Sequence, residues 1–142
     1  MLKGLDPLLG PDLIQVLAAM GHGDEIALVD ANFPAASMAR RLIRLDGVQA
    51  VPVLRAVLSV LPLDSFVERP AATMQVVGDP ETVPPAVADF VRELAAAGSV
   101  APVAPLDRFA FYDRARAAFA IVITGEMRAY GNILLRKGVI FG

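Results

Sequence analysis

The 142-residue chain contains no cysteine and no tryptophan, and it has a single histidine, His22. The lack of cysteine excludes disulfides, thiol catalysis and cysteine-ligated zinc, and it is compatible with a reducing compartment. Hydrolytic zinc sites usually need several His or Cys ligands, so one histidine also argues against a metal centre. Histidine is the residue type that titrates nearest neutrality, and proton transfer at pH 7 would most simply use His22.

Long apolar runs are absent as well. The longest uninterrupted one, residues 117–123, has seven residues, whereas a membrane-spanning helix needs about 18 or more. Charges and prolines within residues 6–12 interrupt the N-terminal leucines before they could form a signal-peptide core. We therefore expect a cytoplasmic protein with no membrane association.

Neither the charge nor the motifs indicate nucleic acid or a nucleotide cofactor. The 13 basic and 15 acidic residues give a net charge of -2, and the basic residues are spread along the chain without forming a patch. The chain has no Walker A sequence, no Gly-x-Gly-x-x-Gly and no Gly-x-Ser-x-Gly. Acid–base chemistry without a cofactor or a metal is the class that remains.

Apolar residues are abundant by contrast. They make up 56% of the chain, and the mean hydropathy is +0.56, which is high for a monomer that must cover itself with polar groups. A chain of this length forms one domain, residues 1–142, and buries roughly 70% of its unfolded surface. We expect the apolar surplus to be buried at a subunit interface.

Hydrophobic periodicity predicts the elements of the fold. Helices are expected over residues 10–20, 52–61, 84–97 and 107–117. Strands are expected over residues 26–29, 41–45, 72–77, 118–124, 130–135 and 139–141, with the last two pairing around Lys137-Gly138. Strands that alternate with helices predict an α/β fold: one layered domain whose central, mostly parallel sheet is flanked by helices.

His22 lies in the segment Gly21-His22-Gly23-Asp24-Glu25, between the first predicted helix and the first predicted strand. The flanking glycines remove bulk from around the imidazole and should leave it approachable. One interpretation is a catalytic acid, and the other is a C-cap histidine at the negative end of the helix dipole. Asp24 and Glu25 either orient the ring or are solvated turn residues.

Further polar residues stand where a ligand could meet them. Asp30 ends a predicted buried strand, where ligands of open α/β sheets collect, although an Asx-type turn is an equal alternative. Tyr130 and Asn132 would share one face of an extended segment, with Gly131 between them permitting close backbone approach. A phenol beside a carboxamide suits a polyhydroxylated ligand; the alternative is an ordinary polar strand face. Arg108 either holds an oxygen-rich group or lies on the surface.

Several blocks of the chain, taken together, resemble the family that contains L-fucose mutarotase and D-ribose pyranase. They are Met-Leu-Lys-Gly at 1–4, Met-Gly-His-Gly-Asp-Glu-Ile at 20–26, Asp-Ala-Asn-Phe-Pro-Ala at 30–35, Arg-Phe-Ala-Phe-Tyr at 108–112, Thr-Gly-Glu at 124–126 and Tyr-Gly-Asn-Ile at 130–133. The resemblance is strongest over 1–47 and 105–140 and loosest over about 66–104. The block at 108–112 is similar to the fucose branch, whereas ribose pyranases tend to carry histidine in this region.

The resemblance implies interconversion of the α and β anomers of a free monosaccharide, with L-fucose as the expected sugar and no cofactor. It implies His22 as the proton donor, and a substrate surrounded by Asp30, Arg108, Tyr130, Gly131 and Asn132. Members of the family form ring-like homo-oligomers, often decamers, whose sites use residues of neighbouring subunits. The alternatives are a non-catalytic monosaccharide-binding module associated with sugar uptake and a structural oligomer without a small ligand.

One distance needs an explanation. If residues 22–30 ran straight, the eight steps from His22 to Asp30 could span up to about 28 Å, too far for one sugar. Either the glycine-flanked segment folds back, or the pocket is assembled from two chains.

Overall fold

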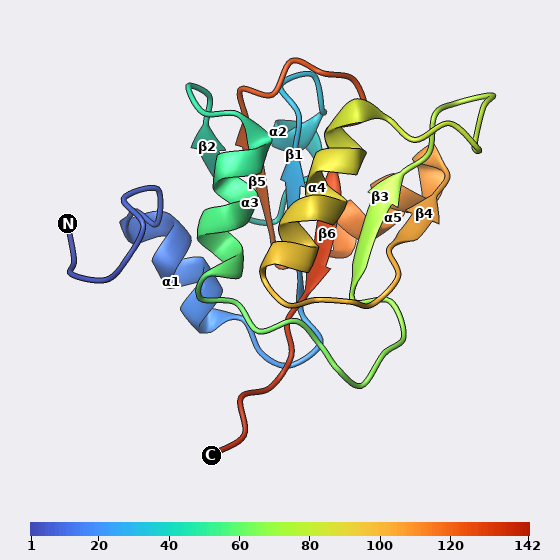
Figure 1. Ribbon diagram of the computed structural model, residues 1–142. Helices are drawn as coiled ribbons and strands as arrows, with labels where there is room; N and C mark the ends of the chain where they lie inside the picture. The colour runs from blue at the N-terminus through green and yellow to red at the C-terminus, as the bar shows by residue number, and fades with distance from the viewer.

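A computed structural model describes the protein over residues 1–142 (Figure 1). The helices are α1 (Pro11–Ala19), α2 (Ala35–Met38), α3 (Ala50–Leu58), α4 (Pro85–Ala96) and α5 (Arg108–Ala117). The strands are β1 (Glu25–Val29), β2 (Leu42–Leu45), β3 (Ala71–Met74), β4 (Ala104–Leu106), β5 (Ala120–Thr124) and β6 (Ile133–Arg136). The predicted α/β fold is confirmed.

The strands form one six-stranded sheet in the order β2-β5-β1-β6-β3-β4. The pairs β2–β5, β5–β1 and β3–β4 are parallel, while β6 lies antiparallel between β1 and β3. A mostly parallel sheet is therefore confirmed, with β6 as its one reversed strand. The reversal brings the loop before β6 to the same edge as the carboxyl ends of β1 and β3.

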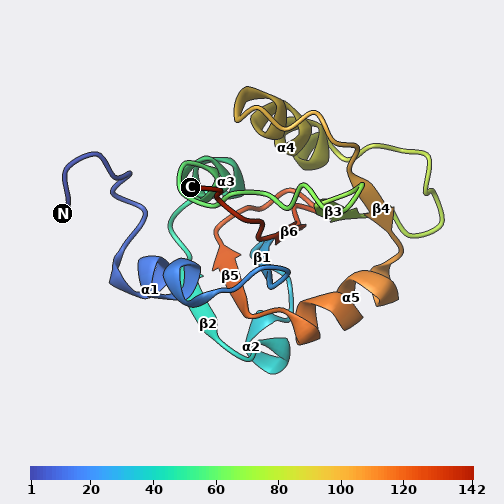
Figure 2. The ribbon, with the colours of Figure 1, turned by 90° about the horizontal axis from the view of Figure 1, so that it is seen from below.

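Helices cover both faces of the sheet. Figure 2 shows α3 and α4 on one side and α2 and α5 on the other. Alternate residues of each strand point to opposite faces: Ile26 and Leu28 join the cluster with α1, α3 and α4, whereas Ala27 and Val29 pack with α2 and α5. Burial on both faces explains why the central strands are continuously apolar.

The strand predicted over 139–141 is wrong, and so is the hairpin around Lys137-Gly138. These residues carry no strand; instead the Nζ atom of Lys137 donates to the carbonyl oxygens of Leu17 and Met20. A Cβ at Gly138 would lie 2.5 Å from the carbonyl oxygen of Leu63. The chain here packs against residues 62–64 instead of turning back on itself, a tertiary contact that apolar alternation does not reveal.

Other boundaries differ for local reasons. The strand predicted over 130–135 begins only at Ile133; Tyr130 has φ 60°, a left-handed conformation that regular extended strand geometry excludes. The short helix α2 and the strand β4 were not predicted. β4 contains Pro105, which a sheet tolerates at its edge, and β4 is the edge strand beside β3.

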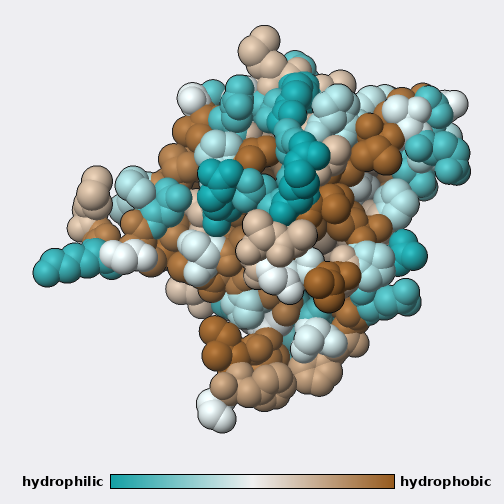
Figure 3. Space-filling model, in the orientation of Figure 1, coloured by the Kyte–Doolittle hydropathy of each residue, from teal (hydrophilic) through white to brown (hydrophobic).

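Apolar side chains remain exposed near the C terminus, as Figure 3 shows at the lower end of the molecule. Phe66, Ile140 and Phe141 are 65%, 78% and 73% exposed. The Phe66 and Phe141 rings lie 6.2 Å apart between centroids. None of the helices combines the length and the apolar character that crossing a bilayer requires.

Candidate active site

Asp30 and Asn132 meet at the carboxyl end of β1. Asp30 directly follows β1, and Asn132 directly precedes its antiparallel neighbour β6. The backbone N–H of Asp30 donates to Oδ1 of Asn132 at 2.9 Å, and both side chains are buried. Two segments about a hundred residues apart in sequence are thereby joined at one edge of the sheet.

The Asp30 carboxyl group lies in a partly desolvated environment. Burial raises the pKa of Asp30, and hydrogen bonds from the backbone of Asn32 and Gly131 and from the Asn132 side chain oppose that rise. The N–H of Asn32 donates to Asp30 Oδ1 at 3.0 Å, so the Asx turn considered from the sequence is present. The turn does not exclude a binding role for Asp30, because the same residue also lines a cavity. A carboxyl group with a raised pKa suits proton exchange nearer neutrality.

A cavity of about 260 Å³ opens beside these residues. Its polar walls are Asp30, Asn32, Arg108, Tyr112, Tyr130 and Asn132, and its apolar walls include Phe33, Met74 and Val77. The structure thus brings together four of the predicted substrate-binding side chains, those at positions 30, 108, 130 and 132. No group of three or more His, Asp or Glu side chains that could hold a metal ion occurs in the structure.

Arg108 reaches the cavity from the start of α5. Asp107 caps this helix by accepting hydrogen bonds from the N–H groups of Phe109 and Ala110, each at 3.0 Å. Arg108 is exposed, and its Nε donates to the Tyr112 hydroxyl at 3.1 Å. Its guanidinium carbon lies 5.3 Å from the centroid of the Tyr112 ring. The remaining guanidinium donors are free to bind an oxygen-rich ligand.

Tyr130 enters the cavity through a left-handed turn, not along the extended face expected from the sequence. Its hydroxyl accepts a hydrogen bond from the N–H of Val77 at 3.2 Å. Tyr130 and Asn132 do line the same cavity, but the turn, and not strand alternation, directs them there.

Gly131 is tightly packed in the loop that precedes β6. A Cβ at Gly131 would lie 2.7 Å from Cγ of Glu126 and 3.4 Å from Cβ of Asp30. The sequence predicted a close backbone approach at Gly131. The groups that approach it in the structure are these two acidic side chains.

Glu126 is a supporting residue that the sequence reading did not assign. Its side chain is 2% exposed, and its Oε1 accepts from both the backbone N–H and the Nε of Arg128 at 3.0 Å. The hydrogen bonds with Arg128 hold the pKa of Glu126 below its ordinary value. Arg128 also pairs with Asp89 of α4 at 2.6 Å. One signal was available: like Asp30, Glu126 follows a buried strand.

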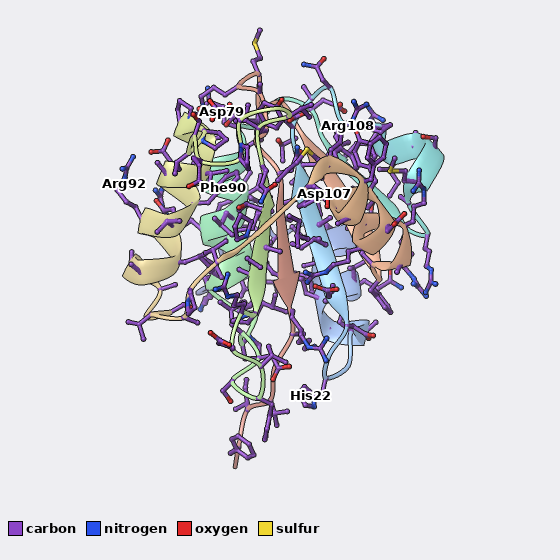
Figure 4. The ribbon with its side chains drawn as sticks, turned by 90° about the vertical axis from the view of Figure 1, so that its right-hand side faces the viewer. His22, Asp79, Phe90, Arg92, Asp107 and Arg108 are labelled. Atoms are coloured by element: carbon purple, nitrogen blue, oxygen red, sulfur yellow. The ribbon has the colours of Figure 1, made fainter.

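His22 does not join this cavity within one chain. It precedes β1, whereas Asp30 follows β1, and Figure 4 shows His22 and Arg108 at opposite ends of the sheet. The five residues of β1 alone rise about 16 Å. The segment therefore does not fold back, which was the first of the two explanations considered for the distance.

The surroundings of His22 also differ from the sequence reading. Helix α1 ends at Ala19 with Met20 as its C-cap, so His22 is not the cap. Its half-exposed side chain contacts Asp64 through Nε2 at 3.1 Å. Asp24 and Glu25 do not orient the ring: Asp24 accepts from the N–H of Gly21, and Glu25 pairs with Arg114.

A larger cavity of about 540 Å³ lies between residues 58–65 and 97–101. Asp64 is its only charged lining residue, and most of the others are apolar. Because a binding site for a polar molecule needs several convergent polar groups, we place the candidate site at the smaller cavity.

The comparisons with known proteins identify the family. The model of the RbsD / FucU transport protein family matches residues 3–140. The chain belongs to this family. Within the family, it is 51% identical to L-fucose mutarotase of Glaesserella parasuis over 144 residues, which cover 98% of this chain and 96% of that protein.

Two further members extend the comparison. The chain is 49% identical to fucose mutarotase of Homo sapiens, covering 98% of this chain and 94% of the human protein. The crystal structure of the fucose mutarotase in complex with L-fucose from Streptococcus pneumoniae superposes with a TM-score of 0.93. That match has 41% identity and covers 99% of this chain and 100% of the other. The predicted resemblance to the fucose branch is confirmed.

Proposed function

We propose that this protein is an aldose mutarotase that interconverts the α and β anomers of free L-fucose by acid–base catalysis without a cofactor. The observation that carries the proposal is the convergence of Asp30, Arg108, Tyr130 and Asn132 on one small cavity. Similarity over the whole chain to proteins named L-fucose mutarotase supports the choice of reaction and sugar.

The two kinds of cavity wall suit a 6-deoxy sugar. L-Fucose carries several hydroxyl groups and one methyl group. Asp30, Asn132 and Arg108 offer acceptors and donors to the hydroxyls, while Met74 and Val77 offer apolar surface to the methyl group. Gly131 does not line the cavity; its backbone hydrogen bond to Asp30 holds that carboxylate in place.

Anomer exchange consists of proton transfers around one bond rotation. A proton reaches the ring oxygen, the hydroxyl proton at the anomeric carbon is removed, and the bond from the anomeric carbon to the ring oxygen breaks. The resulting aldehyde rotates and the ring closes on its other face, which returns both protons. In our proposal His22 is the acid, and Asp30 or a water that it holds takes the hydroxyl proton. Positioned groups of this kind contribute about 10²- to 10⁴-fold.

We propose further that the protein forms a ring-like homo-oligomer, such as a decamer, in which His22 of one subunit completes the cavity of its neighbour. Two observations support this: β1 separates His22 from Asp30 within a chain, and the exposed apolar residues Phe66 and Phe141, which contact each other, lie next to His22. Phe66 packs against the His22 ring with 5.3 Å between centroids. Covering this apolar surface would carry His22 into the contact. The expected cytoplasmic location stays a prediction.

The catalytic assignment is tested with His22→Gln and Asp24→Asn as its matched control. Exchange between the α and β anomers of L-fucose is measured by saturation-transfer NMR on fresh protein. We expect His22→Gln to slow the catalysed exchange by about 10²- to 10⁴-fold and Asp24→Asn to leave it unchanged. Undiminished exchange with His22→Gln overturns the assignment, and wild-type protein that binds fucose without accelerating exchange is a binding module.

The shared site is tested by complementation between two inactive variants. His22→Gln and Asp30→Asn subunits are dissociated, mixed in equal amounts and reassembled. If each site takes His22 from one chain and Asp30 from another, random mixing restores about a quarter of the wild-type activity, because one arrangement in four is intact. If mixing restores no activity, a shared site is refuted. It is also refuted if protein that light scattering shows to be monomeric is fully active.

A further inference from the structure

The loop between β5 and β6, residues 125–132, carries the site residues Tyr130 and Asn132 but no helix or strand. Its backbone-to-backbone hydrogen bonds with other segments lie at its start, at Gly125 and Glu126. The left-handed φ of 60° at Tyr130 is a conformation that a residue with a large side chain keeps only where its surroundings hold it. Side chains must therefore fix the middle of the loop.

Arg128 binds two carboxylates from the middle of this loop. Its backbone N–H and its Nε donate to Oε1 of Glu126, each at 3.0 Å, and its Nη2 donates to Oε2 at 3.1 Å. Its Nη1 donates to Oδ2 of Asp89 in α4 at 2.6 Å. These hydrogen bonds hold the pKa of both carboxyl groups below their ordinary values. Because the guanidinium is a planar fork, two ionised partners fix both its position and its direction. Arg128, Glu126 and Asp89 together form a clamp on the loop.

Glu126 gives the clamp a fixed anchor. Its side chain is 2% exposed, and the backbone N–H of Ala50, the first residue of α3, also donates to it. Separating a buried carboxylate from its cationic partner is strongly destabilising, which keeps Arg128 in place. The clamp therefore fastens the loop to α3 and α4, the two helices that Figure 2 shows on one side of the sheet.

Gly131 lies between the clamp and Asp30. A Cβ at Gly131 would lie 2.7 Å from Cγ of Glu126 and 3.2 Å from the carbonyl oxygen of Arg128 on one side, and 3.4 Å from Cβ of Asp30 on the other. The backbone of Gly131 and the side chain of Asn132 both hydrogen-bond to Asp30. A movement of the clamp would therefore move the groups that hold Asp30, although Arg128 itself does not line the cavity.

We propose that Arg128 is a positioning residue: by binding Glu126 and Asp89 at once it holds the loop against Asp30, so that Gly131 and Asn132 keep their hydrogen bonds to this residue. This role rests on the proposed function, in which Asp30 or a water that it holds takes the anomeric hydroxyl proton. Arg128 exchanges no proton and does not touch the sugar. Its whole effect passes through the placement of the loop.

The first test compares the kinetics of three single variants. Arg128→Met removes the side-chain donors, Arg128→Lys keeps the charge without the fork, and Arg92→Met is the matched control. Arg92 also pairs with Asp89, from an exposed position on α4. kcat and KM for L-fucose are measured by saturation-transfer NMR at several sugar concentrations, at a temperature where circular dichroism shows each variant to be folded.

We expect Arg128→Met to lower kcat/KM by about 10- to 100-fold, because small displacements of positioned groups have effects of this size. Arg128→Lys should lose nearly as much, since a point charge cannot bind both oxygens of Glu126 and reach Asp89 as well. Arg92→Met should keep wild-type kinetics. Wild-type kinetics in Arg128→Met overturn the proposal, and so does full activity in Arg128→Lys, which would mean that charge alone is needed.

The second test is the pH profile of kcat/KM, which a general loss of stability would not shift. Hydrogen bonds to an ionised carboxylate lower its pKa, so weakening those from Gly131 and Asn132 raises the pKa of Asp30. The acidic limb of the profile should move to higher pH by at least about half a unit in both Arg128 variants. The other titratable or charged groups that line the cavity, Arg108, Tyr112 and Tyr130, are the same in every variant. An unmoved acidic limb refutes the proposal.

A double variant covers the case in which Arg128→Met does not fold. Arg128→Met with Glu126→Gln leaves no unpaired buried charge, and it should show the same loss of kcat/KM and the same shift of the acidic limb. Wild-type kinetics in this double variant refute the proposal.

Asp30→Asn separates this proposal from the proposed function. If Asp30→Asn exchanges the anomers of L-fucose at the wild-type rate, the proposed role of Asp30 fails and the role of Arg128 falls with it. If Asp30→Asn is impaired while Arg128→Met has wild-type kinetics, the proposed function stands and only the role of Arg128 is wrong.

Discussion

Replacing Gly131 by alanine tests how tightly the site loop is packed. The new Cβ would lie 2.7 Å from Cγ of Glu126 and 3.2 Å from the carbonyl oxygen of Arg128. Carbon atoms pack best at about 3.5–4.0 Å, so the first contact is about 0.8 Å too short. Glu126 cannot retreat easily, because Arg128 binds both of its carboxylate oxygens, at 3.0 and 3.1 Å.

Overpacking of this kind costs about 1–3 kcal/mol. For a domain of this size each kcal/mol lowers Tm by about 3 °C, so the expected loss is about 3–9 °C. Anomer exchange should fall about 10- to 100-fold, since the same shift moves Asp30 and the N–H of Gly131. Tm is measured by circular dichroism at one fixed protein concentration, because assembly makes the transition depend on concentration.

Gly47→Ala is the matched control. It adds the same methyl group in a turn where a Cβ meets no atom within 4 Å and φ is not positive. Its Tm should be unchanged or slightly higher, because alanine restricts the unfolded chain. Wild-type Tm and exchange in Gly131→Ala would show that the loop is loosely packed and would refute the reasoning.

Three further substitutions test the electrostatics and the capping around the site. Burial raises the pKa of Asp30, so the folded state holds its proton to higher pH; the Tm difference, wild type minus Asp30→Asn, should shrink as pH rises from about 4 toward 7. A Tm difference that grows over this pH range would contradict the raised pKa of Asp30. Arg128 lowers the pKa of Glu126, so the stabilisation that this ion pair provides is lost as pH falls through the folded-state pKa. The free energy of unfolding of the wild type should exceed that of Glu126→Gln by about 1–3 kcal/mol at pH 7, and this difference should shrink in acid. A constant difference would refute this pairing. Asp107→Ala removes the cap of α5 and should cost about 1 kcal/mol by thermal unfolding, which an unchanged Tm would contradict.

Elements with a strong local pattern were predicted well. Helices α1, α4 and α5 lie within two residues of their predicted bounds, because their apolar residues recur at helical spacing and prolines or Asp107 mark their starts. β4 and the segment after Gly138 were not predicted correctly. Whether β4 forms an edge strand or a loop, and whether the C-terminal segment forms a strand or a tail, depends on what packs beside each of them.

Some residues of the candidate site could likewise be expected from the sequence, and others could not. Asp30 directly follows a buried strand, so its place at the carboxyl-end edge of the sheet could be expected from the sequence. Tyr130 and Asn132 precede β6, and they reach the same edge only because β6 is reversed. Asp64 could not be expected: it lies in an irregular segment 42 residues from His22 and carries no motif. Asp24 and Glu25 are nearer in sequence, yet both are engaged elsewhere.

Local residue order was thus sufficient for the α/β class, for most elements and for the short set of polar residues able to exchange protons, since periodicity and residue chemistry are properties of neighbours along the chain. Tertiary packing alone placed β6 in reverse between β1 and β3, brought residues 30 and 132 into contact, and set Asp64 against His22. These arrangements depend on which distant segments bury one another's surfaces, and no short stretch of chain encodes that.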